Sequence, residues 1–295
     1  ARFFFFFCQT TKAWNKNMFE DKHLKVLYYE QDSSQIFPNT DIKGGIAVTY
    51  RDAQKEFESI NTFIPFEELK SINKKVGATF DTSLSRVITG SVPYRFTDIV
   101  KEEVPQAVKL AGNSFDVRTN ALDKLDGILF FDERPSDGQE YVQIFGLYNK
   151  QRVYRWIKAK YIEGPSNFRK YKIFVPKSNG SGAIGEVLST PLIGEPLIGH
   201  TQTFISIGSV ENKMQAENIL KYIKTKFTRA LLGILKVTQD NPVATWQKVP
   251  LQDFTSNSDI DWSQSIAELD AQLYRKYGLS QEEIDFIESK VKEME

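Results

Sequence analysis

The stretch LKVLYYEQDSSQIFPNTDIKGGIAVTYR, residues 24–51, decides how the N-terminal part of the chain folds. Its two ends, residues 24–30 and 46–50, are rich in β-branched and aromatic residues, a composition typical of strands. Residues 39–41 and the glycine pair 44–45 are turn-forming clusters that lie between these runs. The sequence therefore predicts two neighbouring strands joined by an irregular connector.

The connector carries a phenylalanine followed by a proline, Phe37 and Pro38. An aromatic ring held at the edge of a sheet is suited to stacking against a flat ligand such as a nucleobase. Periodicity alone allows a second interpretation, in which Phe37 packs into the core and anchors the loop.

Composition narrows the classes of protein to be considered. The chain has 295 residues, of which 41% are hydrophobic and 26% are charged, which is typical of a globular protein with a sizeable core. A single cysteine excludes a disulfide framework and a cysteine-based zinc site. The two histidines, His23 and His200, are too few and too far apart in the sequence to predict a histidine metal centre. No apolar run approaches the roughly 20 residues that span a bilayer, so we expect a cytoplasmic protein with no membrane partner.

The charges are unevenly distributed although the formal net charge is zero. Residues 150–177 hold nine basic residues against one acidic residue, Glu163, which gives a local charge of +8. If these residues form strands, alternation turns the aromatic side chains inward and the basic ones outward. A phosphate backbone is the simplest partner for such a row. We therefore expect DNA contacts from Arg152, Arg155, Lys158 and Lys172.

Helices and further strands are predicted along the rest of the chain by periodicity and capping signals. The expected helices are residues 11–21, 63–76, 212–236, 265–277 and a last helix that begins at a capping box, Ser280 to Glu283. The apolar stripe of that last helix is expected to pack against the rest of the chain. Residues 77–150 are expected to form strands joined by turns, among them residues 128–131 and 142–145. Strands are also expected within residues 151–162 and 171–175.

The segment Gly180-Ser-Gly-Ala-Ile-Gly185 has the spacing GxGxxG after a predicted strand. A dinucleotide site needs a long helix that begins at these glycines, and Pro191 and Pro196 prevent one here. A loop close to DNA suits the preceding Lys177, Ser178 and Asn179 better, because their side chains can contact base edges or phosphates. On helix 212–236, Arg229 lies on a polar face that is either solvated or in contact with phosphate.

Several segments together resemble site-specific N6-adenine DNA methyltransferases of type II restriction-modification systems, including the Taq methylase type and fused methylase-endonucleases. The resemblance is to the C-terminal part of these enzymes, and it is weakest at residues 77–150. It lies in the strand pair of residues 24–51, KAWNKNM (12–18), YKIFVPK (171–177), IGEP (193–196), AENILKYIKTKF (216–227) and YRKYGLSQEEIDFIE (274–288). The resemblance implies that Phe37 contacts an adenine flipped out of the duplex, and that Lys43 and Arg51 lie near the DNA backbone.

The chain departs from this family at its catalytic motifs. It contains no Pro-Pro pair, so the Asp/Asn-Pro-Pro-Tyr/Phe motif that holds the adenine amino group is missing, and so is the glycine turn that binds S-adenosylmethionine. The chain also begins at Ala1 without a methionine. We therefore expect the C-terminal part of a longer enzyme, with the cofactor S-adenosylmethionine and the catalytic residues in an upstream catalytic domain and no cofactor in this chain.

The expected fold is α+β: edge strands of a Rossmann-like methyltransferase sheet, then a mixed α/β target-recognition domain and C-terminal helices. The corresponding boundaries are residues 1–60 for the end of the catalytic domain, 61–250 for the target-recognition domain and 251–295 for a helical closing segment. Double-stranded DNA and the catalytic domain are the expected partners. Two alternatives remain, a stand-alone DNA-specificity protein that acts in trans and an inactive remnant of such an enzyme.

Overall fold

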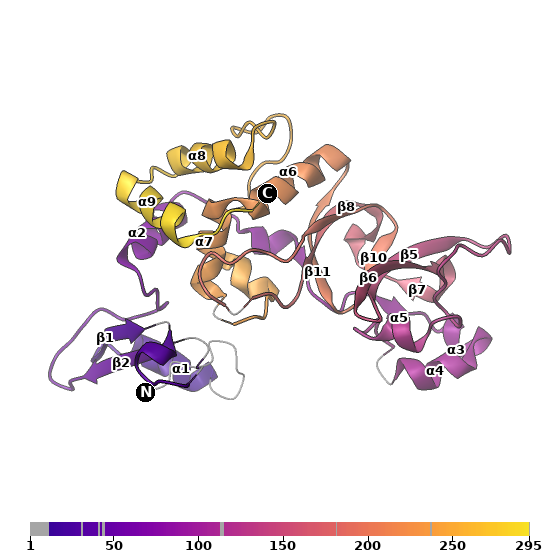
Figure 1. Ribbon diagram of the computed structural model, residues 1–295, viewed down its shortest axis with the longest axis horizontal. Coiled ribbons are helices and arrows are strands. Elements are labelled where there is room, and N and C mark those ends of the chain that lie inside the picture. The colour runs from indigo at the N-terminus through magenta and orange to yellow at the C-terminus, as the bar shows by residue number, and fades with distance from the viewer. Residues whose placement is uncertain are drawn as a thin grey trace.

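The computed structural model describes residues 12–30, 32–40, 42, 45–112, 115–180, 182–236 and 238–294 (Figure 1). The fold is mixed α+β, as predicted, with several small sheets that are mainly antiparallel. The α-helices are α1 Lys12–Glu20, α2 Glu67–Gly77, α3 Ile99–Glu103, α4 Pro105–Ala111, α5 Ala121–Lys124, α6 Lys213–Lys224, α7 Lys226–Leu235, α8 Ile266–Lys276 and α9 Gln281–Lys290. The strands are β1 Leu24–Glu30, β2 Ile46–Arg51, β3 Ile88–Thr89, β4 Arg95–Phe96, β5 Tyr141–Tyr148, β6 Gln151–Lys158, β7 Ile162–Glu163, β8 Tyr171–Pro176, β9 Leu192–Gly194, β10 Ile198–His200 and β11 Phe204–Val210.

The N-terminal unit consists of α1 and the strand pair β1–β2, drawn in indigo at one end of the molecule in Figure 1. The two strands are antiparallel, with Tyr29 opposite Ala47, and a register shift lies between Val26 and Tyr28. The predicted strands and the predicted helix over residues 11–21 are therefore confirmed. Phe19 of α1 and Leu24 of β1 are buried.

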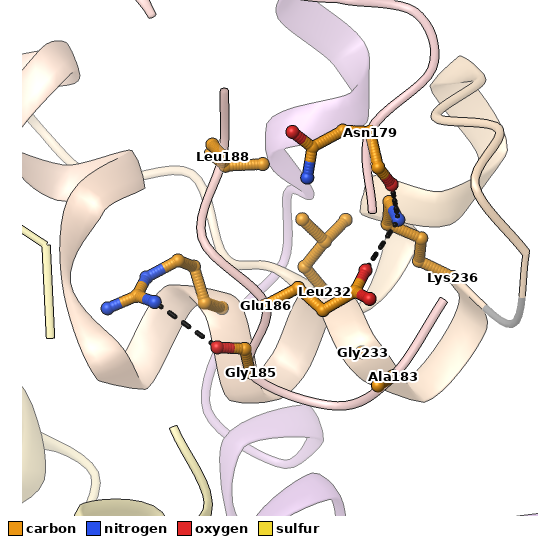
Figure 2. Close-up of a pocket in the computed structure, with 9 residues that line it drawn as sticks. Asn179, Ala183, Gly185, Glu186, Leu188, Leu232, Gly233 and Lys236 are labelled. Atoms are coloured by element: carbon orange, nitrogen blue, oxygen red, sulfur yellow. Dashed lines mark hydrogen bonds and ion pairs between the residues drawn. The ribbon is translucent and has the colours of Figure 1, made fainter. Parts of the chain in front are cut away.

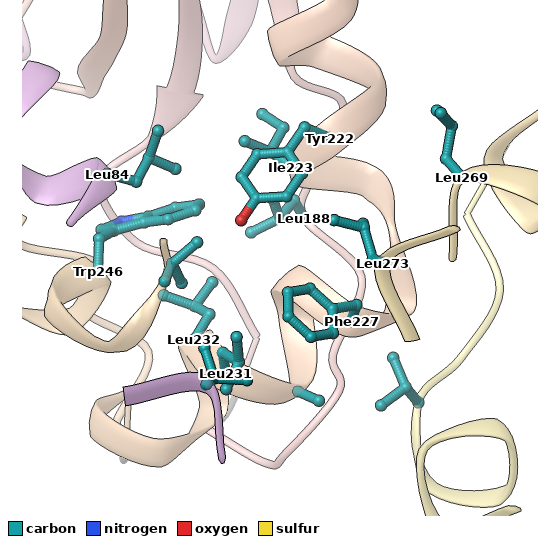
Figure 3. Close-up of a cluster of buried hydrophobic side chains, with 14 of the residues drawn as sticks. Leu84, Leu188, Tyr222, Ile223, Phe227, Leu231, Leu232, Trp246, Leu269 and Leu273 are labelled. Atoms are coloured by element: carbon teal, nitrogen blue, oxygen red, sulfur yellow. The ribbon is translucent and has the colours of Figure 1, made fainter. Parts of the chain in front are cut away.

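The largest core lies between a four-stranded sheet and helices from both halves of the chain. The sheet has the order β3–β11–β8–β9 and is antiparallel. Ile173 of β8 and Ile205 of β11 pack in one apolar cluster with Ile223 of α6 and Phe227 of α7. Figure 3 shows part of this cluster, including the aromatic side chains of Tyr222, Phe227 and Trp246.

The C-terminal helices belong to the same core. Leu269 and Leu273 of α8 and Ile287 of α9 are fully buried in the cluster that contains Phe227. The apolar stripe predicted for the last helix therefore packs internally, as expected. The predicted capping box at Ser280 forms at the start of α9, and a second capping box is present at Ser265 in α8. Residues on both sides of position 250, among them Val249 and Phe254, belong to this one cluster.

A second apolar cluster belongs to the middle of the chain. It joins α3, α4 and α5 to the sheet β10–β5–β6 and to the short pair β4–β7. Strand β10 runs parallel to β5, whereas β5 and β6 form an antiparallel hairpin. Three buried phenylalanines connect this sheet to the four-stranded sheet: Phe145 stacks on Phe174 with ring centroids 5.7 Å apart and lies 4.6 Å from Phe204.

The prediction of strands throughout residues 77–150 is wrong in part. Three helices, α3 to α5, lie between residues 99 and 124. Pro105 occupies the first turn of α4, where its missing N–H costs nothing, and Ala107 is buried. Residues 128–131 form only isolated bridges, including one from Phe131 to Trp156, whereas residues 142–145 lie in β5 as predicted.

The single helix predicted over residues 212–236 is also wrong, because α6 and α7 are separate helices. Thr225 lies between them with extended backbone angles, φ −57° and ψ 148°, and its side chain accepts a hydrogen bond from the Thr228 N–H. The carboxylate of Asp270 in α8 accepts the Lys226 N–H at 2.9 Å and the Phe227 N–H at 2.8 Å. Two caps on the first turn of α7 therefore satisfy the donors that a continuous helix would use internally.

The position of Asp270 gives a prediction for the pH dependence of stability. Burial raises the pKa of the Asp270 carboxyl from 3.8 to about 6, so the folded chain keeps a proton there that the unfolded chain has lost. Stability from this group is present below about pH 4 and is lost as the pH rises through 6. We expect the free energy of unfolding of the wild type, relative to Asp270→Asn, to fall by on the order of 2 kcal/mol between about pH 4 and 7. Urea unfolding of both proteins across this range measures the change. A wild type that becomes more stable relative to Asp270→Asn as the pH rises would contradict the assignment.

Candidate nucleic-acid interface

Phe37 lies at the surface on a braced loop between β1 and β2. Its side chain is 51% exposed, so it is not the core anchor that periodicity alone allowed. The hydroxyl of buried Ser33 donates to the Thr40 carbonyl at 2.7 Å and accepts from the Ile42 N–H at 2.8 Å, which ties the two sides of the loop together. The loop is therefore held in place while the aromatic ring itself stays available.

The two basic residues that the resemblance places near the DNA backbone, Lys43 and Arg51, have different outcomes. Lys43 lies outside the described residues. Arg51, at the end of β2, is exposed, and its Nε donates to the Asp21 carboxylate at 2.8 Å. The Arg51 hydrogen bond is the main reason why the pKa of Asp21 is lowered. Arg51 is thus reachable from solvent but already has one anionic partner.

One face of the β1–β2 pair presents apolar side chains to solvent. Tyr28 and Val48 are opposite each other across the two strands and are 50% and 47% exposed. Leu27 and Tyr50 are exposed close by. A two-stranded sheet is marginally stable by itself, and an exposed apolar face of this kind is typical of a surface that another element covers.

The alternation predicted for the basic segment is reversed on β6. Tyr154 is exposed, whereas Arg155 is 7% exposed and forms an ion pair with Asp132. The guanidinium of Arg155 also lies 4.6 Å from the centre of the Tyr148 ring. Lys158 forms an ion pair with Asp137 at 3.0 Å, and this hydrogen bond raises the pKa of Lys158. Arg155 and Lys158 are therefore neutralised within the fold.

Lys172 was predicted to contact DNA but is fully buried. Its ammonium group donates to the main-chain carbonyls of Phe168, Lys170 and Glu195 at 3.2, 3.1 and 2.8 Å. Burial lowers the pKa of Lys172 to about 7. All three donors of the group are used internally, so Lys172 is a structural residue in this fold and does not reach a DNA phosphate.

Arg152 is the exposed cation of β6. Its Nη1 donates to the Thr190 carbonyl at 2.8 Å and its Nη2 to the Ser189 carbonyl at 3.0 Å. The guanidinium lies 5.5 Å from the centre of the Phe204 ring. Arg152 therefore keeps its full charge in a fixed position, because carbonyls and a ring orient it without neutralising it.

The three residues predicted after β8 differ in exposure. Lys177 is half-buried, its N–H donates to the Thr203 carbonyl, and Ser178 is exposed and donates to Asp240 at 3.0 Å. Asn179 is buried, and its side chain bonds to Val187 and Ser189. The prediction that Asn179 reaches base edges is therefore wrong, because its amide group fastens the loop that follows.

Two buried cationic side chains, Lys236 and Arg229, hold the glycine-containing loop after β8 against α7 (Figure 2). The ammonium of Lys236 donates to the Asn179 carbonyl at 2.7 Å and forms an ion pair with Glu186 at 3.3 Å. Arg229 donates from Nη1 to the Gly185 carbonyl at 3.3 Å. Residues 182–191 form no helix, so the geometry of a dinucleotide site is not built here.

Arg229 is 1% exposed, which excludes both interpretations made from the sequence, a solvated position and a phosphate contact. Its burial lowers its pKa to about 10, since the charged form loses solvation. Glu186 and Lys236 were not predicted from the sequence either, because their pairing depends on how the loop returns to α7. Residues 50 positions apart meet only in the folded chain.

Arg152, Tyr154, Lys177 and Ser178 together form what we call the Arg152–Ser178 surface. Its two parts are linked through Ser189, whose carbonyl accepts from Arg152 and whose N–H donates to Asn179. The side chains of Arg152 and Lys177 lie at Phe204 and Ile205, neighbours on β11 that belong to different apolar clusters. This surface contains two of the basic residues predicted from the sequence. Arg155, Lys158, Lys172 and Arg229 do not belong to it.

Within the described ranges, no three histidine, cysteine or acidic side chains come together as metal ligands. None of the helices that the structure describes is long and apolar enough to cross a membrane. Comparison with models of known protein families and with curated protein sequences found no match for this chain.

Proposed function

We propose that this chain is the DNA-recognition part of a site-specific N6-adenine DNA methyltransferase of a restriction-modification system. The observation that carries the proposal is Phe37, an exposed aromatic ring on a loop that Ser33 braces from behind. An extruded adenine loses stacking worth on the order of a few kcal/mol, and a fixed aromatic ring compensates for it. The family resemblance places the contact with that base at the same residue.

The exposed apolar face of β1–β2 supports the second part of the proposal, an upstream catalytic domain. We propose that the β1–β2 pair completes the catalytic sheet of that domain, which covers Tyr28 and Val48 and gives the isolated pair its missing neighbours. In this proposal the catalytic residues and S-adenosylmethionine belong to the upstream domain, and the chain described here supplies DNA contacts.

The proposed phosphate contacts are fewer than the sequence predicted. Arg152 and Lys177 remain because they carry exposed or half-exposed charge with no carboxylate partner among the described residues. Ser178 lies beside them and can donate to a phosphate oxygen. Arg51 remains a candidate at the opposite end of the β1–β2 pair from the Phe37 loop, where a phosphate would compete with Asp21.

Binding to duplex DNA at several salt concentrations tests this proposal directly. We expect the logarithm of the affinity of the chain for a random-sequence duplex to fall linearly with the logarithm of salt concentration, with a slope near −0.9 per phosphate contacted. Arg152→Gln should reduce the magnitude of the slope by about 1 and weaken binding by roughly tenfold at low salt. Fluorescence anisotropy with a labelled duplex measures both quantities.

Lys70→Gln is the matched control, because Lys70 is an exposed lysine on α2 that pairs with Glu67 away from the Arg152–Ser178 surface. Its affinity and slope should match the wild type. A wild-type affinity that does not respond to salt would overturn the DNA-binding function. Equal effects of Arg152→Gln and Lys70→Gln would overturn the placement of the contact at Arg152.

A further inference from the structure

A pocket of about 400 Å³ opens beside the Arg152–Ser178 surface. Lys177 and the segment 238–245 line it together with Gly90, Ser91 and Ile205. Ile205, Pro242 and Val243 supply apolar wall, while Lys177, Asp240 and Asn241 supply polar groups. This volume and this mixture of apolar wall and few polar groups are typical of a site for a small molecule or one nucleotide unit.

The wall of the pocket is rigid, because two distant segments pair there. The Asn241 N–H donates to the Lys177 carbonyl at 2.7 Å, and the Asn179 N–H donates to the Gln239 carbonyl at 2.7 Å. The hydroxyl of Ser178 donates to Asp240 Oδ1 at 3.0 Å. These hydrogen bonds, rather than attraction between charged side chains, therefore fix the positions of Lys177 and Asp240.

One buried polar group of the pocket lacks a hydrogen-bond partner. Asn241 is fully buried, and its Oδ1 accepts from the Thr245 hydroxyl at 3.2 Å, but its Nδ2 has no hydrogen-bond partner in the described part of the chain. The Asp240 carboxylate is exposed and Lys177 is half-buried, so solvent reaches both of these charged groups. A buried donor without a partner destabilises a fold, so the Asn241 amide calls for an explanation.

We propose that this pocket binds one nucleotide unit, with its base between the apolar wall and the polar groups and its phosphate at Lys177. Each nucleobase combines hydrogen-bond donors and acceptors at its edge with an apolar face, which matches an ammonium, an amide and a carboxylate beside Ile205 and Val243. The unit comes either from an unstacked position of bound DNA or from a free mononucleotide. The first source rests on the proposed function, whereas the second does not.

Gly90 allows the pocket to be filled without disturbing the fold. It lines the pocket, and a Cβ built there would meet only the Val243 Cγ2 atom, at the ordinary contact distance of 4.0 Å. Gly90→Leu should therefore place its side chain in the open space. Gly77→Leu is the matched control, because a Cβ at Gly77, at the end of α2, would meet nothing within 4 Å.

The experiment titrates the full chain with each of the four deoxynucleoside 5′-monophosphates and with inorganic phosphate, by calorimetry or NMR. We expect saturable binding of at least one nucleotide, weakened tenfold or more in Gly90→Leu and unchanged in Gly77→Leu. A duplex that contains 2-aminopurine tests the DNA source in parallel, and Gly90→Leu should abolish any fluorescence increase at an unstacked position.

The outcomes separate this proposal from the proposed function. Nucleotide binding without salt-dependent duplex binding would support a free-nucleotide site and overturn the DNA function. Duplex binding with no nucleotide titration, and with equal 2-aminopurine signals in Gly90→Leu and the wild type, would overturn the pocket assignment alone. Inorganic phosphate that binds as tightly as every nucleotide would overturn it as well, because the base would then contribute nothing.

Discussion

Replacing Gly185 by alanine is expected to lower the free energy of unfolding by about 3 kcal/mol, from left-handed backbone strain and overpacking together. Gly185 has φ +73°, a region that alanine adopts only at a cost. A Cβ there would lie 2.6 Å from the Val291 Cα and 2.9 Å from the Lys290 carbonyl oxygen, which are backbone atoms at the end of α9. Urea or thermal unfolding of the variant measures the loss.

The control for this variant is Gly278→Ala, because Gly278 has φ +62° but no atom within 4 Å of a built Cβ. Gly278→Ala should cost about 1–2 kcal/mol, the conformational part alone. The Gly185 variant should also weaken duplex binding, since the same loop supplies the Ser189 and Thr190 carbonyls that orient Arg152. Equal losses of stability in the two variants would show that contact with α9 is not what requires glycine at residue 185.

Replacing Phe37 by alanine is expected to separate function from stability. Because the ring is half exposed, the free energy of unfolding of the chain should change by no more than about 0.5 kcal/mol. In an enzyme completed with its catalytic part, the same change should weaken flipping of the target adenine by up to about 3 kcal/mol of stacking. The fluorescence of 2-aminopurine at the target position and the methylation rate report the second effect.

Phe37→Trp is the matched variant, since it keeps a flat aromatic ring at the same position and should retain flipping. A loss of about 3–5 kcal/mol of stability in Phe37→Ala would instead identify the residue as a core anchor. Unchanged fluorescence and an unchanged methylation rate in that variant would remove Phe37 from the proposed site.

Local sequence patterns predicted the elements that depend on neighbouring residues. Strands β1, β2 and β8 follow from runs of β-branched and aromatic residues, α8 follows from the helix predicted over residues 265–277, and α9 follows from the capping box at Ser280. The break at Thr225 was missed because it depends on Asp270, which lies 44 residues from Lys226 and caps α7 from another helix. Helices α3 to α5 were missed because each is short and is stabilised by packing in the second cluster rather than by a long periodic pattern.

The sequence by itself determined the mixed α+β class, the N-terminal strand pair and the positions of the C-terminal helices, because these depend on periodicity and caps within a few residues. Only the tertiary structure decided which basic residues remain available. Arg155 pairs with Asp132, Lys160 with Glu103 and Lys170 with Glu211, across 23, 57 and 41 positions of the chain. A local charge of +8 counts these cations without their partners, and the folded chain neutralises them because charge pairing depends on distance in space and not in sequence.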